Sequence, residues 1–336
     1  MTQAGKHPVD HTRKAAGVRA AAVIGAAVSL AGCGADLTGP ERVPDVQAAL
    51  GGITAADLRE RVEIVAHDSM QGRATPSPGL EMTAGYIVEE FVDFGLRPGG
   101  EEGYVQRFPV GAAPGIDAPN VIGWVEGADP QLKGQYIVFS AHMDHLGTGP
   151  AVGGDSVFNG ADDNASGTAA VLELAEAFAL LEEKPRRSLV FMAFAGEEGG
   201  LIGSRWYTDH PTLPLEGTVA NINLDMIGRN WTDAIAAISL SDDLVRAAER
   251  ASDDHPELGM QVIDNPWSER NLIQRSDQFS FIRYGVPGVF FTSGLHDDYH
   301  ALSDEADKLD YEKMERVARL MFYLGLRLAN ADKPPN

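Results

Sequence analysis

Imidazole and carboxylate side chains stand where apolar segments of this chain end. The apolar run at 136–141 is followed by His-Met-Asp-His at 142–145, and the run at 188–194 is followed by a Glu pair at 197–198. Two further runs, 219–224 and 286–292, precede an Asp and a short His-rich segment. The side chains that share this placement are His142, Asp144, Glu197, Glu198, Asp225, Tyr299 and His300. Carboxylates this close to buried strands are costly unless a cation compensates them, so the pattern predicts a metal site.

The types of these residues narrow the metal and its number. Imidazole and carboxylate ligands without a nearby thiolate suit zinc in a catalytic site, although the residues alone also allow cobalt or manganese. Two histidines and three carboxylates are too many for one catalytic zinc, but they can serve two metals that share a carboxylate. The acidic pair Asp162–Asp163, flanked by Gly160 and Gly167, is a source for that shared ligand. Of the two neighbouring glutamates, the one that is not a ligand could act as a general base.

The elements that must position these residues alternate between two kinds of pattern. Continuously apolar runs predict buried strands, at 136–142, 188–194, 219–224 and 286–292, and 104–110 and 120–125 read as strands of a meander. Amphipathic spacing predicts helices, starting at 54 and covering 79–94, 167–183 and 311–329. Such an alternation indicates an α/β fold with helices on both faces of the sheet, and ligands then bind beyond the carboxyl ends of the strands.

The N-terminal segment has the pattern of an export signal. Basic residues precede the apolar stretch 20–30, which is too short for an ordinary membrane span, and Leu-Ala-Gly leads into Cys33. This resembles a bacterial lipobox, so we expect a lipoprotein signal peptide at 1–32, a flexible tether at 33–50 and a folded domain with the predicted metal site at 51–332. A plain secretory signal is the alternative. Cys33 is the only cysteine, which rules out an intrachain disulfide.

The expected location and partners follow from these features. A lipid on Cys33 would attach an exported protein to the bacterial cell envelope, and Gly34 after it favours the outer membrane or cell surface. We expect a monomer that touches the membrane only through this anchor. The net charge of −22 argues against nucleic acid as a partner.

Five motifs together resemble one known family. They are Ala-His-Met-Asp-His at 141–145, Gly-Ala-Asp-Asp-Asn-Ala-Ser-Gly at 160–167, Phe-Ala-Gly-Glu-Glu-Gly at 194–199, Asn-Leu-Asp-Met at 223–226 and Tyr-His at 299–300. In this order they are similar to the co-catalytic two-zinc aminopeptidases, metallopeptidase family twenty-eight, over roughly residues 55 to 328. The resemblance implies a three-layer α/β/α zinc-peptidase fold with a central mixed, mostly parallel sheet. It also implies hydrolysis of the N-terminal bond of peptides with a free amino terminus.

The resemblance implies a role for each site residue. His142 and Asp225 would bind one zinc, Glu198 and His300 would bind the other, and Asp162 would bridge the two ions. Glu197 would be the general base, Asp144 would orient the imidazole of His142, and Tyr299 would donate to the oxyanion. The family also implies a cis peptide bond between Asp162 and Asp163.

Other polar residues near the motifs have less defined roles. We expect His145 to shape the rim of the site and Asp163 to support the bridge. The loop residues His296, Asp297 and Asp298 are expected to be polar surface groups, some of them within reach of substrate. Trp231 and Trp267 are candidates for an apolar pocket. The chain departs from the family at Ala301 and Glu305, where threonine is usual.

Two other functions fit parts of the pattern. Glutaminyl cyclases share the fold but use one zinc and usually lack the His-x-Asp at the strand end, so the presence of His142 and Asp144 argues against them. A surface-displayed binding module with an inactive peptidase fold would be expected to have lost ligands, whereas every predicted ligand and Glu197 are present.

Overall fold

A computed structural model describes residues 43–112 and 114–336. The helices are α1 Val43–Gly52, α2 Ala55–Val65, α3 Pro78–Asp93, α4 Gly167–Leu180, α5 Ile202–Asp209, α6 Asp242–Asp254, α7 Gln278–Ile282 and α8 Tyr311–Asn330. The strands are β1 Arg97–Pro98, β2 Val105–Pro109, β3 Asp117–Val125, β4 Tyr136–His142, β5 Gly147–Val152, β6 Asp155–Phe158, β7 Ser188–Phe194, β8 Thr218–Leu224, β9 Ala234–Ser239, β10 Gln261–Asp264 and β11 Gly288–Thr292.

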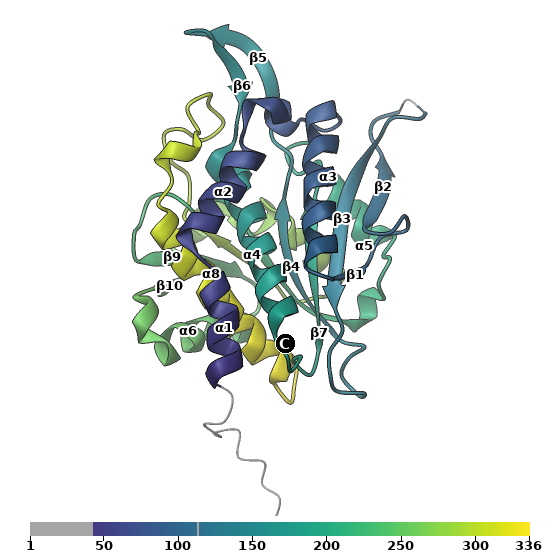
Figure 1. The fold of residues 1–336 in the computed structure, drawn as a ribbon, viewed down its shortest axis with the longest axis vertical. Helices are drawn as coiled ribbons and strands as arrows, with labels where there is room; N and C mark the ends of the chain where they lie inside the picture. Colours follow the sequence, from purple (N-terminus) through teal and green to yellow (C-terminus); the bar gives the residue numbers. More distant parts are fainter. Residues whose placement is uncertain (1–42, 113) are drawn as a thin grey trace, which may run out of the picture. The chain divides into compact units, whose positions relative to one another are not determined.

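One mixed sheet forms the centre of the domain (Figure 1). Its order is β1-β3-β7-β4-β8-β11-β9-β10, with β2 paired to β3. The four central strands, β7, β4, β8 and β11, run parallel, and in this register His142 of β4 lies beside Phe194 of β7. Strands β3 and β9 pair antiparallel to β7 and β11, which makes the sheet mixed. The carboxyl ends of the four central strands therefore meet at one edge.

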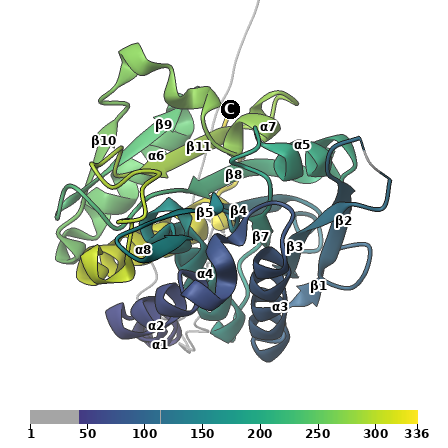
Figure 2. The same ribbon diagram turned by 90° about the horizontal axis from the view of Figure 1, so that it is seen from above.

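Helices cover both faces of this sheet (Figure 2). The large helices α4 and α8 lie on one face together with α1, α2 and α3, while the shorter α5 and α7 lie on the other. Residues of β7 alternate between the faces: Leu189, Phe191 and Ala193 join the core under α4, and Val190 and Met192 join the core under α7. Alternation of apolar residues explains why the strand reads as one continuous apolar run.

The architecture confirms the predicted α/β class with helices on both sides of a mixed sheet. The predicted strands 136–142 and 188–194 have the same bounds as β4 and β7. The structure differs at the predicted tether, because residues 43–52 form α1 and its Ala49 and Leu50 are buried. The signal peptide, Cys33 and the tether up to residue 42 lie outside the described residues.

Two of the segments that the sequence analysis did not predict lie at the edges of the fold. The segment β9-α6-β10 extends the sheet beyond β11, and α6 Asp242–Asp254 is strongly amphipathic with Leu244 and Ala248 buried. The hairpin β5-β6 projects from the domain beside the carboxyl edge of the sheet (Figure 1). Within the described part of the chain, every helix is too short or too polar to cross a membrane.

Candidate metal centre and active site

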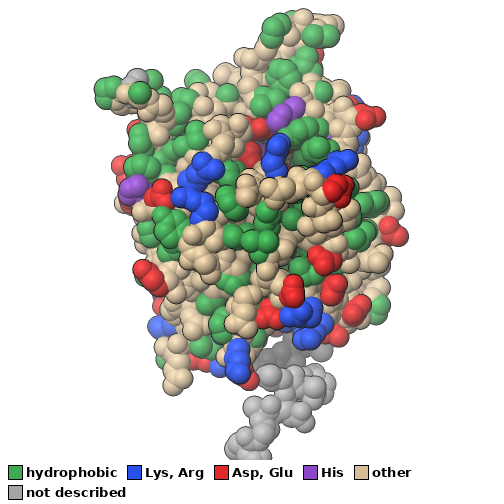
Figure 3. Space-filling model, turned by 180° about the vertical axis from the view of Figure 1, so that it is seen from behind, with side chains coloured by type: hydrophobic (Ala, Val, Ile, Leu, Met, Phe, Trp, Pro, Cys, Tyr) green, Lys and Arg blue, Asp and Glu red, His purple; other side chains and the backbone are tan. Residues whose placement is uncertain are grey.

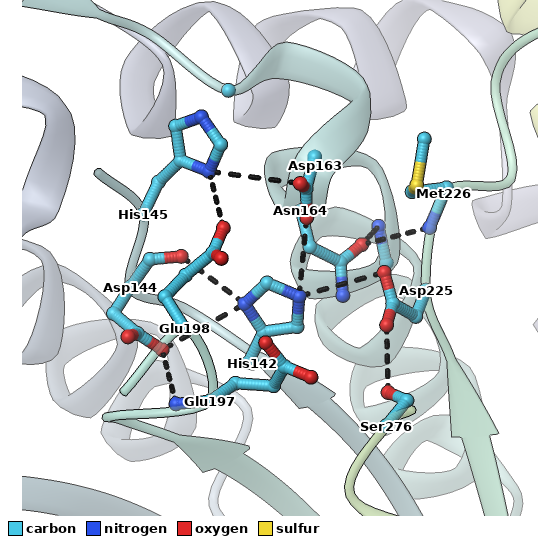
Figure 4. A network of polar contacts seen from close by, with 12 residues as sticks. His142, Asp144, His145, Asp163, Asn164, Glu197, Glu198, Asp225, Met226 and Ser276 are labelled. Atoms are coloured by element: carbon cyan, nitrogen blue, oxygen red, sulfur yellow. Dashed lines mark hydrogen bonds and ion pairs between the residues drawn. The ribbon is translucent and has the colours of Figure 1, made fainter. Parts of the chain in front are cut away.

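The predicted site residues converge at the carboxyl edge of the central strands (Figure 4). His142 is the last residue of β4, and Asp225 directly follows β8. Glu197 and Glu198 lie three and four residues after the end of β7. Two groups of imidazole and carboxylate side chains result, each compact enough to hold a metal ion.

The first group consists of His142, Asp163 and Asp225, all buried. His142 Nε2 lies 3.3 Å from Asp163 Oδ1 and 3.4 Å from Asp225 Oδ1. The other oxygen of Asp225 accepts a hydrogen bond of 2.6 Å from the Ser276 hydroxyl, which fixes the orientation of the carboxylate. One imidazole nitrogen and two carboxylate oxygens thus face a common point.

The second group contains Asp163, Glu198 and two imidazoles. His300 Nε2 lies 3.1 Å from Asp163 Oδ2 and 3.1 Å from Glu198 Oε2. His145 Nδ1 lies 2.8 Å from Glu198 Oε1 and 3.8 Å from Asp163 Oδ2. We expected His145 only to shape the rim of the site, but its ring is buried and directly contacts a predicted zinc ligand.

Asp163 belongs to both groups, and this corrects the predicted bridging residue. Its Oδ1 faces His142 and its Oδ2 faces His300, so one carboxylate faces each group with a different oxygen. The expected cis peptide bond is also one residue later than predicted, between Asp163 and Asn164. The sequence shows an adjacent pair of aspartates, and nothing in their spacing distinguishes which of them faces the histidines.

Asp162 faces away from the first group. Its Oδ1 accepts a hydrogen bond of 2.7 Å from the backbone N–H of Gly228, and its Oδ2 lies 3.2 Å from His296 Nε2. Asp304 stabilises the same turn, because its carboxylate accepts hydrogen bonds from the backbone N–H groups of Asp162 and Asp163. Asp162 thus has the role that we had expected for Asp163, which is to support the bridging residue. The side chain of His296 is a buried partner of Asp162 and not a surface group.

Asp144 acts on His142 through a different atom from the one predicted. The backbone carbonyl of Asp144 lies 3.1 Å from His142 Nδ1, at hydrogen-bond distance, whereas the nearest carboxylate oxygen of Asp144 is 3.7 Å away. The Asp144 carboxylate instead accepts from the Thr75 hydroxyl and from the backbone N–H of Glu197. Asp144 thereby orients His142 with Nε2 toward Asp163 and also ties the end of β4 to the loop that carries Glu197.

The electrostatics of the site match a centre built for cations. Burial opposes the charged form of His142, yet the carboxylates of Asp225, Asp144 and Asp163 raise its pKa well above the ordinary value. Burial likewise opposes the charged form of His300, but Asp163 and Glu198 raise its pKa to about 9. Bound cations would interact with the same carboxylates that raise these two pKa values.

Glu197 and Tyr299 both line the cavity beside the first group. Burial, together with the nearby carboxylates of Asp225, Asp277 and Glu198, raises the pKa of Glu197 well above its ordinary value. Burial and the surrounding carboxylates also raise the pKa of Tyr299, which keeps the phenol protonated as a hydrogen-bond donor. The Tyr299 ring stacks on His300 with centroids 3.8 Å apart.

Arg73 holds the two loops of the site together. Its fully buried guanidinium donates to the carbonyls of Met143, after β4, and of Asn159 and Gly160, before the aspartate pair, at 2.7–3.0 Å. The sequence offered one signal for this residue, a Gln-Gly-Arg segment that interrupts a helical pattern. Gly160 is required here because a Cβ would lie 2.2 Å from the Asp163 carbonyl.

A cavity of about 290 Å³ opens beside the first group. Its wall combines site residues with apolar and basic side chains from the loops after β8, β10 and β11. The residues that line it are His142, Asp163, Glu197, Asp225, Met226, Trp267, Arg270, Leu272, Arg275, Phe290, Thr292, Gly294, Leu295 and Tyr299. Trp267 therefore forms part of the pocket as predicted, and Trp231 stacks behind it with ring centroids 5.3 Å apart.

The donor set fits zinc. Each group offers imidazole nitrogen and carboxylate oxygen, the ligands of catalytic zinc sites. The atoms Asp163 Oδ2 and His300 Nε2 are buried and, although 3.1 Å apart, make no hydrogen bond to each other or to another group of the described structure, as expected for ligand atoms.

Comparisons with known proteins identify a matching family and a protein with the same fold. The model of peptidase family M28 matches residues 120–325. The aminopeptidase LapA of Legionella pneumophila has the same fold, with a TM-score of 0.68 at 22% identity, covering 87% of this chain and 76% of LapA.

Two curated relatives are enzymes of related kinds. A probable zinc metalloprotease of Pyricularia oryzae is 28% identical, with 87% of this chain and 67% of the relative aligned. A probable glutamate carboxypeptidase of Arabidopsis thaliana, LAMP1, is 27% identical, with 68% of this chain and 36% of the relative aligned. The chain thus spans about one third to two thirds of the length of these relatives.

Proposed function

Because the chain belongs to peptidase family M28, whose members include zinc metallopeptidases, we propose that it is a two-zinc aminopeptidase. The reaction would be hydrolysis of the first peptide bond of peptides with a free amino terminus. The observation that carries this proposal is Asp163, whose two carboxylate oxygens face two separate groups of ligands. A shared carboxylate is the feature that distinguishes a two-metal site from a single catalytic zinc.

The proposed ligands follow from the contacts of each group. One zinc would be held by His142, Asp163 and Asp225, and the second by Asp163, Glu198 and His300. His145 would then support Glu198 through the 2.8 Å contact between its Nδ1 and Oε1. When bound, the two ions would polarise the substrate carbonyl and lower the pKa of water.

The protein groups would complete the reaction. Glu197, which lines the cavity together with the first group, would take a proton from the attacking water and deliver it to the leaving amine. Tyr299 would donate its hydroxyl hydrogen to the carbonyl oxygen as negative charge develops there. The carboxylates around the metals would attract the positively charged amino terminus, which suits an exopeptidase acting at that end.

The proposal extends to the location of the enzyme. We infer that the chain is exported and anchored to the cell envelope as a monomer, by a lipid on Cys33. The support is the basic and apolar pattern of residues 1–32 that ends at the only cysteine. Metabolic labelling with a fatty-acid analogue tests this: label should be incorporated by the wild type and be absent from Cys33→Ser.

Replacement of the proposed general base tests the catalytic assignment. Glu197→Gln keeps the shape of the side chain but cannot take a proton, so kcat for aminoacyl 4-nitroanilides should fall by about 10²–10⁴-fold. The zinc content should stay at the wild-type level, because Glu197 is not among the proposed ligands. Equal activity in both proteins, or no activity in the zinc-loaded wild type, would contradict the assignment.

A further inference from the structure

The loop between β10 and α7 places two arginines on the wall of the active-site cavity. Arg270 and Arg275 both line it, on the side formed by Trp267 and Leu272. The same cavity is lined by the carboxylates of Asp163, Glu197 and Asp225. A single cavity therefore combines carboxylates that metal ions would neutralise with two basic side chains.

The position of Arg275 is fixed by its neighbour in the chain. Ser276, the next residue, donates its hydroxyl hydrogen to Asp225 Oδ2 at 2.6 Å. Arg275 is thus one residue away from a group that contacts a proposed zinc ligand. Its own backbone is held by a hydrogen bond from its N–H to the Leu272 carbonyl.

The loop itself is packed against the end of the sheet. Trp267 packs on Gly294, after β11, where a Cβ would come within 2.3 Å of the indole ring. The ring of Trp231 stacks on the same indole. This packing makes the loop a defined wall, which is the condition for a charge on it to select a substrate.

The two guanidinium groups differ in their partners. The nearest carboxylate to Arg270 is that of Glu269, at 3.9 Å, and both side chains are largely exposed. For Arg275 the described structure contains no ion pair and no side-chain hydrogen bond. The Arg275 side chain is exposed, so it is free to contact a substrate in the cavity. Lys and Arg side chains lie among apolar ones in the upper half of the face shown in Figure 3, close to a histidine.

We propose that Arg275, assisted by Arg270, binds the side-chain carboxylate of an acidic N-terminal residue, so that peptides beginning with Glu or Asp are preferred substrates. This inference rests on the aminopeptidase function proposed above. An exopeptidase of that kind has one residue on the amino side of the scissile bond, and this cavity adjoins the metal groups. A guanidinium binds a carboxylate in a two-pronged arrangement. Met226, Phe290 and Leu272 supply apolar surface in the same cavity for the methylene groups of such a side chain.

Paired substrates of equal shape test the proposal. For the zinc-loaded wild type we expect kcat/KM to be about tenfold or more higher for glutamyl than for glutaminyl 4-nitroanilide, since a hydrogen bond to a charged group is worth about that factor. Arg275→Gln should reduce this ratio about tenfold, mainly through KM, while glutaminyl and leucyl anilides change little. Arg275→Lys should keep part of the preference. Arg283→Gln, an exposed arginine outside the cavity, is the matched control and should leave the ratio unchanged.

Three results would overturn the proposal. The first is equal hydrolysis of glutamyl and glutaminyl anilides by a wild type that is active on both, which leaves the aminopeptidase function intact. The second is that Arg275→Gln changes only the ratio of kcat/KM between dipeptides with free and with amidated carboxyl termini. That result would mean that the arginines bind the C-terminal carboxylate. The third is a zinc-loaded wild type that hydrolyses no anilide or dipeptide, which would remove the aminopeptidase function as well.

Discussion

The two adjacent aspartates give the sharpest test of the site, because only one of them lies between the ligand groups. Asp163→Asn and Asp162→Asn each remove one charge and preserve the shape of the side chain. The pKa of Asp163 lies well below its ordinary value: burial opposes its charge, but His142 and His300 overcome that effect. Asp163 is therefore ionised at neutral pH, so its replacement by asparagine removes a real charge.

The expected size of the effect follows from simple electrostatics. A carboxylate and a single positive charge about 4 Å apart attract by about 4 kcal/mol at an effective dielectric constant of 20, and the double charge of zinc makes this a lower bound. Loss of that attraction corresponds to a decrease in zinc affinity of about a thousandfold. Because Asp163 faces both groups, Asp163→Asn should weaken both zinc sites and abolish peptidase activity.

Asp162→Asn should behave differently. Its amide oxygen can still accept the hydrogen bond from Gly228, so the turn should persist and zinc binding should weaken far less. Zinc affinity would be measured by competition with a chromogenic chelator, with circular dichroism as the control for folding. A thousandfold loss in Asp162→Asn together with near-normal affinity in Asp163→Asn would refute the assignment of the bridge.

Three further outcomes follow from the structure. Tyr299→Phe should lower kcat by about 10²-fold with little change in KM, because an oxyanion donor acts mainly in the transition state; steady-state kinetics will show a KM effect instead if the ring only binds substrate. Arg73→Met should lower the unfolding free energy by about 3 kcal/mol or more, measured in urea, since it leaves several buried carbonyls unpaired. In the zinc-free protein the pKa of His300 is raised to about 9, so its contacts contribute stability that is present below pH 6.5 and lost as the pH rises through 9. The pKa of Glu198 is lowered to about 2, so its contacts contribute stability that is lost as the pH falls through 2. Thermal melts in chelator should therefore show falling stability from pH 6.5 to 9, and an unchanged melting temperature over that range would contradict the contacts of this pair.

The sequence was sufficient for the parts of the fold that depend on strong patterns. The central strands are predicted by apolar runs because both of their faces are buried. The helices α4 and α8 are predicted by helical spacing because one full stripe of each is buried. The segment β9-α6-β10 was missed because β9, Ala-Ile-Ala-Ala-Ile-Ser, is short and rich in alanine, which is weak evidence for a strand.

The sequence predicts most residues of the site, but it does not predict which of their atoms face one another. Placement at strand ends identified His142, Glu198 and Asp225, because parallel strands bring their carboxyl ends together. The choice between Asp162 and Asp163 depends on the backbone conformation of residues 160–164, which no local pattern specifies. The wall formed by Arg275 depends on the packing of Trp267 against Gly294, which follows β11.

The number of zinc ions per chain tests the central claim most directly. Metal analysis and native mass spectrometry of the purified enzyme, titrated from the chelated state, would report the count and the activity at each step. We predict two zinc ions per chain, with full activity only when both are bound. Saturation at one ion with full activity would contradict the two-zinc centre bridged by Asp163.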